Sequence, residues 1–165
     1  MATEWAIFCK LGGHVNSKRE IIGVYPEFPD IISEPNKILD ICFPVGTKPG
    51  DFILNKYNKF QVLSYIFKIP KTDERDDLLS YSILIEKKEK AFLYKFVMVE
   101  LFHILEENNM LSEELLMENQ QKIYQGLNTE TDIDINGIKI QFSKIFEDFR
   151  NKLIKKKPNL KGSFF

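Results

Sequence analysis

The chain has 165 residues, of which 44% are hydrophobic and 13% aromatic, a length and composition that fit one domain with a sizeable core. Its 23 basic and 24 acidic side chains give a formal net charge of -1, which excludes a global field that would hold the chain on nucleic acid. The N-terminus lacks a basic segment followed by an apolar one, and no stretch approaches the ~20 apolar residues that span a bilayer. We therefore expect a cytoplasmic protein with a single domain at residues 1–157 and a basic flexible tail at residues 158–165.

The first fifty residues predict a hairpin followed by a long connection. Apolar, strand-forming residues run from Glu4 to Leu11 and from Glu20 to Tyr25, and Gly12-Gly13 between them predicts a turn. From Pro26 to Gly50, five prolines and two glycines leave room for at most one short helix, near Ile31 to Ile41.

The two cysteines, Cys9 and Cys42, each lie inside an apolar run, where a free thiol packs as a small hydrophobe. Two such thiols indicate the cytosol more than secretion. A zinc site needs about four ligands at short spacing, whereas these cysteines and the histidines His14 and His103 are scattered singly. We therefore expect neither a bound metal nor a cofactor.

The middle of the chain predicts a second pair of strands and then helices. Side chains that would share one face of a strand recur at every second position in Phe60 to Ile69 and again in Leu78 to Ile85. The charged loop from Lys71 to Asp77 lies between these two predicted strands. Ala91 to Glu107 carries apolar residues on almost every side, which predicts a deeply buried helix laid across a sheet. Ser112, followed by two glutamates, predicts the N-cap of another helix that ends near residue 126.

The last forty residues predict one more helix. Thr129 to Lys139 contains Asn136-Gly137, which indicates either a tiny hairpin with a type I′ turn or a loop. The helix, at about Ile140 to Lys156, has an apolar stripe formed by Phe142, Ile145, Phe146, Phe149 and Leu153. Together these elements predict an α+β fold, in which an antiparallel sheet of four to five strands is packed by C-terminal helices.

This order of elements resembles a longin domain, and the local sequence is similar to the upstream DENN module. In that module a tyrosine-proline precedes a Cys-Phe-Pro turn and a central hairpin strand, as in Ile22 to Pro26, Ile38 to Gly46 and Phe60 to Lys68 here. The hairpin and the helix after it are similar to the longin halves of folliculin and its DENN-type relatives. The resemblance covers Glu4 to Glu107. It departs from the pattern at Val45, where an acidic residue is usual, and 165 residues leave no room for the central and downstream DENN parts.

The resemblance implies a non-catalytic protein-binding module in small-GTPase regulation or vesicle and membrane traffic. Such a module would dock a small GTPase, or dimerise with another longin or roadblock-like domain, including a second copy of itself. Partners in longin-type pairs meet at an edge strand or at the helix beside it. The predicted partner-binding residues are therefore Ile21, Val24, Tyr25, Phe28 and Ile31. The alternative is that these residues fill the domain's own core.

Two other functions stay open. One is a small enzyme with a site near His103 or the acids between Asp73 and Asp77, although those acids lack the spacing and turn glycine of a calcium-binding EF-hand. The other is a purely structural subunit of a complex. A substrate-sized pocket that gathers His103 or the acids would favour the enzyme, and a flat apolar strand edge would favour the binding module.

The basic segment from Lys152 to Lys161, followed by Phe164-Phe165, has two interpretations. It would hold the protein weakly on anionic lipid, at about 1 kcal/mol per basic residue near the surface, or it is an ordinary lysine-rich end. Nucleic acid is not expected as a partner, because the acidic loop and the near-neutral charge balance oppose it.

Overall fold

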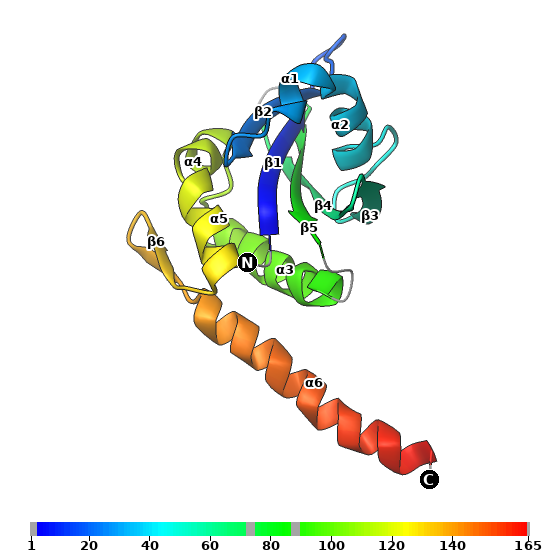
Figure 1. The fold of residues 1–165 in the computed structure, drawn as a ribbon. Helices are drawn as coiled ribbons and strands as arrows, with labels where there is room; N and C mark the ends of the chain where they lie inside the picture. The colour runs from blue at the N-terminus through cyan, green and yellow to red at the C-terminus, as the bar shows by residue number, and fades with distance from the viewer. Residues whose placement is uncertain (1–2, 72–74, 87–89, 165) are drawn as a thin grey trace.

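The computed structural model describes residues 3–71, 75–86 and 90–164. A five-stranded antiparallel sheet runs through its centre with the strand order β2-β1-β5-β4-β3 (Figure 1). The strands are β1 (Thr3–Leu11), β2 (Glu20–Tyr25), β3 (Phe52–Tyr57), β4 (Phe60–Ile69) and β5 (Asp77–Ile85). Helices lie on both faces, and each face has its own apolar cluster. The α+β fold is therefore as predicted, with five strands in the main sheet.

One face of the sheet is covered by two short helices, α1 (Asp30–Ser33) and α2 (Pro35–Cys42). The sequence predicted one helix here, but Pro35 carries no N–H group and cannot continue a helix from the preceding turn. It occupies the first turn of α2 instead, where backbone N–H groups have no acceptor within the helix, so the absence of this group costs no hydrogen bond. The thiols of Cys9 and Cys42 are free and buried beneath α2, which confirms the prediction for both.

The C-terminal end of α2 is held by side chains from outside the helix. The last four carbonyls of a helix have no partner within it and need one elsewhere. Arg19 donates to the carbonyls of Leu39 and Phe43 at 3.4 and 2.6 Å. Asn55 of β3 donates to the carbonyl of Ile41 at 2.8 Å. These hydrogen bonds fix α2 on its face of the sheet.

The opposite face is covered by α3 (Ala91–Glu107), α4 (Glu113–Glu118) and α5 (Gln120–Thr129) (Figure 1). The predicted burial of the first of these helices is confirmed, since Tyr94, Val97, Met98, Leu101 and Leu105 are fully buried. The Ser112 hydroxyl caps α4 by accepting the N–H of Leu115 at 3.2 Å. The single helix predicted after Ser112 is broken at Asn119 into α4 and α5.

The last elements are the hairpin β6 (Ile133–Ile135) and β7 (Ile138–Ile140) and the helix α6 (Phe142–Phe164). The start of α6 is tightly packed, because Phe142 and Phe146 are buried and a Cβ atom at Gly126 of α5 would lie 2.4 Å from the Phe142 ring. Arg150 donates two hydrogen bonds, of 2.5 and 2.6 Å, to the carboxylate of Glu130. The helix continues past its predicted end, through residues 158–164, and its far part runs away from the domain (Figure 1).

β3 was not among the strands predicted from the sequence. This strand follows the long connection and turns directly into β4 through Asn58, which has a φ of 53°. The predicted second pair of strands is therefore a three-stranded meander, and β3 rather than β4 forms that edge of the sheet.

Candidate protein-binding surface

The main sheet has two edge strands, β2 and β3, and an edge strand can pair with a strand of another protein. β2 pairs with β1 through a bulge, because Phe8 lies opposite Gly23 while Cys9 lies opposite Ile21. α4 and α5 also lie close to this strand, since a Cβ atom at Gly23 would be 2.9 Å from the sulfur of Met117. A bulged strand is a poorer template for strand addition than a regular one.

The five predicted partner-binding residues lie on β2 and in the connection after it, at Ile21, Val24, Tyr25, Phe28 and Ile31. Phe28 is buried and stacks on the Trp5 indole, with ring centroids 4.4 Å apart. Ile21, Val24 and Ile31 are half-buried against the apolar cluster beneath α2, and Tyr25 lies edge-on to Tyr124 on the other face. All five therefore pack within the domain, and every one except Phe28 keeps some exposed surface. Partner binding at these positions stays a prediction.

β3 differs from β2, because it pairs with β4 in unbroken register, residues 52 to 57 opposite residues 65 to 60. On the side of α3, Leu54 is 42% exposed and Lys56 is exposed as well. Among the described residues no strand pairs with the outer edge of β3, and Figure 1 shows this strand at the margin of the domain. An unpaired strand edge in regular register, with an exposed leucine on it, suits strand addition.

The adjacent side of α3 extends this surface. Phe92, Lys95 and Val99 lie at helical spacing on one side of α3, and the Lys95 ammonium lies 5.3 Å from the centre of the Phe52 ring of β3. Phe92 is 76% exposed and Val99 is 43% exposed, so two apolar side chains of α3 face solvent beside the free strand. We call the set Phe52, Leu54, Lys56, Phe92, Lys95 and Val99 the β3–α3 surface.

The charge on the β3–α3 surface is positive. Lys56 and Lys95 form no ion pair with any carboxylate of the described residues, whereas nearby Lys59 is paired with Glu86 at 3.3 Å. Exposed apolar side chains flanked by unpaired lysines favour a partner that presents apolar and acidic groups together.

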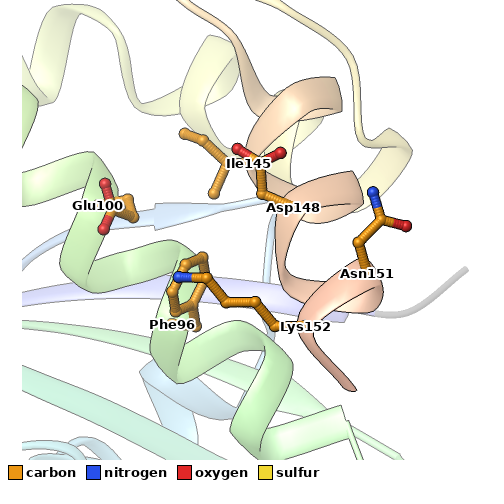
Figure 2. A pocket seen from close by; sticks show the side chains of 6 residues that line it. All are labelled: Phe96, Glu100, Ile145, Asp148, Asn151 and Lys152. Atoms are coloured by element: carbon orange, nitrogen blue, oxygen red, sulfur yellow. The ribbon is translucent and has the colours of Figure 1, made fainter. Parts of the chain in front are cut away.

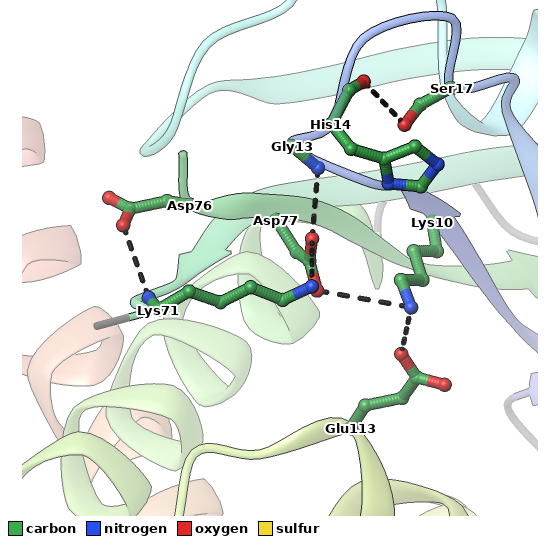
Figure 3. A network of polar contacts seen from close by, with 8 residues as sticks. All are labelled: Lys10, Gly13, His14, Ser17, Lys71, Asp76, Asp77 and Glu113. Atoms are coloured by element: carbon green, nitrogen blue, oxygen red, sulfur yellow. Dashed lines mark hydrogen bonds and ion pairs between the residues drawn. The ribbon is translucent and has the colours of Figure 1, made fainter. Parts of the chain in front are cut away.

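Hydrogen bonds and ion pairs connect the end of the acidic loop, at Asp77, to the turn between β1 and β2 (Figure 3). Asp77, at the start of β5, is buried and accepts the Gly13 N–H at 3.0 Å. Its carboxylate also lies 3.2 Å from the Lys71 ammonium and 3.8 Å from that of Lys10, and Lys10 pairs with Glu113 at 2.6 Å. Burial alone raises the pKa of Asp77, but the Gly13 N–H and the two lysines outweigh it and hold that pKa below its ordinary value. This network ties β1, β5 and α4 together.

The geometry of an enzyme site is not evident among the described residues. His103 is exposed on α3, with its Nε2 2.8 Å from the Glu107 carboxylate, and it lines none of the three clefts of about 460 to 470 Å³. Asp73 and Glu74 lie outside the described residues. The cleft between α3 and α6 is lined by Phe96, Glu100, Ile145, Asp148, Asn151 and Lys152, and these side chains do not form a nucleophile–base pair (Figure 2). No three histidine, cysteine or acidic side chains of the described part could hold a metal ion.

No family model matches the chain, and no curated protein sequence is significantly similar to it. None of the helices within the described ranges is long and apolar enough to cross a membrane.

Proposed function

We propose that this chain is a non-catalytic protein-binding module in small-GTPase regulation or membrane traffic, and that it binds its partner through the β3–α3 surface. The observation that carries the binding role is the free, regular edge of β3, with the exposed side chains of Leu54, Phe92 and Val99 beside it. Exposed apolar side chains beside an open strand edge mark sites of protein association.

The connection to small GTPases rests on the resemblance to longin and upstream DENN modules. The order of elements behind that resemblance, a strand pair, a connection, a hairpin and a packed helix, is present in the structure.

The charge of the surface bears on which partner binds. A second copy of the chain would bring Lys56 and Lys95 to the interface from both sides, and like charges at an interface oppose association. A different protein, with an edge strand or extended segment that carries acidic side chains, would pair with these lysines. We therefore favour a heteromeric complex with a small GTPase or with another longin or roadblock-like domain.

Light scattering tests this proposal, with the purified chain alone and mixed with candidate small GTPases in nucleotide-free and GTP-loaded states. We expect a monomer that forms a complex with one GTPase in one nucleotide state. A complex that forms equally well in both nucleotide states would instead indicate a structural subunit. A monomer that ignores every candidate would contradict the regulatory role.

A pair of double variants locates the interface. Leu54→Ser with Phe92→Ser removes two exposed apolar side chains of the β3–α3 surface, and we expect affinity to fall at least tenfold, because full burial of a leucine or phenylalanine side chain contributes about 1.5 to 3 kcal/mol. Ile32→Ser with Val15→Ser is the matched control, since both residues are more than 80% exposed and lie outside this surface. Equal loss in both double variants would contradict the assignment.

A further inference from the structure

Charge is divided unevenly along the chain. Residues 149–165 contain Arg150 and five lysines and no acidic residue, and Asp148 is the last acid in the sequence. The other 17 basic and all 24 acidic side chains lie in residues 1–148, which therefore carry a net charge of -7. The near-neutral total conceals a strongly basic segment, which we call the acid-free segment.

The acid-free segment begins where α6 still packs on the domain, at Phe149 and Arg150, and continues along the part of α6 that leaves it. The apolar stripe of α6 begins in the core, where Phe142 and Phe146 are fully buried and Phe149 packs at the margin. Leu153 is already 45% exposed, and from there the helix extends away from the sheet (Figure 1). The stripe thus passes from the protein interior into solvent.

Apolar residues return on the same helical side after a break of one turn at Lys156 and Lys157. Leu160 and Phe164 follow Leu153 by seven and eleven residues, which is the spacing of one helical side. Pro158 removes one backbone hydrogen bond from this part of α6, but the apolar residues keep their spacing across it. Six of the thirteen other residues in the segment are basic, so the segment combines apolar positions at helical spacing with basic residues between them.

We propose that the acid-free segment binds the surface of an anionic lipid bilayer. An amphipathic helix with a lysine-rich polar side lies in the interfacial plane, where its apolar side enters the headgroup boundary and its lysines meet lipid phosphates and carboxylates. A nucleic acid would also attract the lysines, but it would leave the apolar stripe without a partner. The stripe therefore favours lipid. This inference rests on α6 alone and is independent of the β3–α3 surface.

Vesicle flotation of the full chain tests the proposal. We expect binding to phosphatidylcholine vesicles that contain about 30 mol% phosphatidylserine and little binding to pure phosphatidylcholine. Binding should weaken several-fold when salt is raised to about 0.5 M, because salt screens attraction to the charged surface. Equal binding to neutral and anionic vesicles, or binding to neither, would overturn the proposal.

The triple variant Lys155→Gln, Lys156→Gln, Lys157→Gln tests the charges. Each basic residue near an anionic surface raises the partition coefficient about fivefold, so we expect the triple variant to bind about a hundredfold more weakly. These lysines follow Leu153, which is already 45% exposed, so the circular dichroism spectrum and melting temperature should not change. Unchanged vesicle binding by this folded variant would overturn the proposal.

The matched control neutralises three lysines on the folded body, Lys18→Gln, Lys48→Gln and Lys144→Gln, and it should keep most of the binding. A second variant, Leu160→Ser with Phe164→Ser, keeps every charge and should bind at least tenfold more weakly if the apolar stripe enters the bilayer. Full binding by this variant, together with equally tight binding of the parent chain to single-stranded RNA, would replace lipid with nucleic acid as the partner.

Discussion

Replacement of Asp77 by asparagine tests whether the network in Figure 3 stabilises the fold. Asp77 is 3% exposed, accepts the Gly13 N–H, and has two lysine ammonium groups within 3.8 Å. Asparagine keeps an oxygen for Gly13 but places an NH₂ group or a neutral oxygen beside the lysines. The loss of a charge-assisted contact costs about 1.5 to 3 kcal/mol. We expect Asp77→Asn to lower the free energy of unfolding by about 2 kcal/mol, which is about 4–8 °C in melting temperature.

The same substitution has a predictable dependence on pH. Because folding holds the pKa of Asp77 below its ordinary value of 3.8, the contribution of this carboxylate is complete above the unfolded pKa. It is lost as the pH falls through the lower, folded pKa. The stability difference between the parent chain and Asp77→Asn should therefore be constant between about pH 7 and 5 and should shrink below about pH 4.

Urea denaturation at several pH values measures both effects. Asp76→Asn is the matched control, because Asp76 is one residue away and only partly buried, with the Lys68 ammonium 3.7 Å from its carboxylate. We expect this control to change stability by less than about 0.5 kcal/mol. A pH-independent stability difference for Asp77→Asn, or a loss no larger than that of the control, would refute the reasoning.

Three further predictions concern packing. Gly126→Ala should destabilise the fold by about 1 to 2 kcal/mol in urea denaturation, because the new Cβ atom would overlap the buried Phe142 ring. The free-energy cost of this overlap exceeds the gain of about 1 kcal/mol in helix propensity. A more stable variant would contradict this. Arg19→Met should speed amide hydrogen exchange throughout α2 and cost about 1 to 3 kcal/mol, since it removes the charged donor to the Phe43 carbonyl and the second donor to the Leu39 carbonyl. The thiols of Cys9 and Cys42 should react with a disulfide reagent many-fold more slowly in the folded chain than in denaturant, because both are buried and their mutual hydrogen bond and burial raise the pKa of Cys9; equal rates would refute this.

Strong periodicity made most elements predictable from the sequence. The strands β4 and β5 alternate over nine or ten residues, and α3 is apolar on nearly every side, so local pattern and tertiary position agree. β3 was missed because it is short, contains Asn55 and Lys56, and follows a segment crowded with proline and glycine. The short run of strand-forming residues Phe52-Ile53-Leu54, with Tyr57 after it, was the available signal.

The helix breaks at Pro35 and Asn119 were harder to predict. Proline indicates that a helix begins or ends nearby, but it does not say whether the residues before it also form a turn of helix. At Asn119 the side chain donates to the Leu115 carbonyl at 2.8 Å and competes with the backbone ladder, a choice that depends on how α4 and α5 pack on the sheet. Local propensity does not contain that information.

The β3–α3 surface could not be predicted from the sequence for a different reason: strand order is a tertiary property. A hairpin at the N-terminus has two strands, and the sequence does not say which of them pairs with β5 and which remains at the edge. It also does not reveal the bulge opposite Phe8 or the helices that cover β2. The predicted residues around β2 therefore lie on one of the two edge strands of the sheet, and partner binding there stays a prediction.

The remaining geometry restricts where strand addition can occur. One face of the sheet is occupied by α2, which Arg19 and Asn55 fix in place, and the other is occupied by α3, α4 and α5. Strand addition does not need a free face, because its hydrogen bonds lie in the plane of the sheet. It needs an unpaired edge in regular register, which β3 has and the bulged β2 lacks. Backbone hydrogen bonds alone contribute little net binding free energy, so an interface also needs apolar surface to bury. Leu54, Phe92 and Val99 provide exposed apolar surface beside the β3 edge.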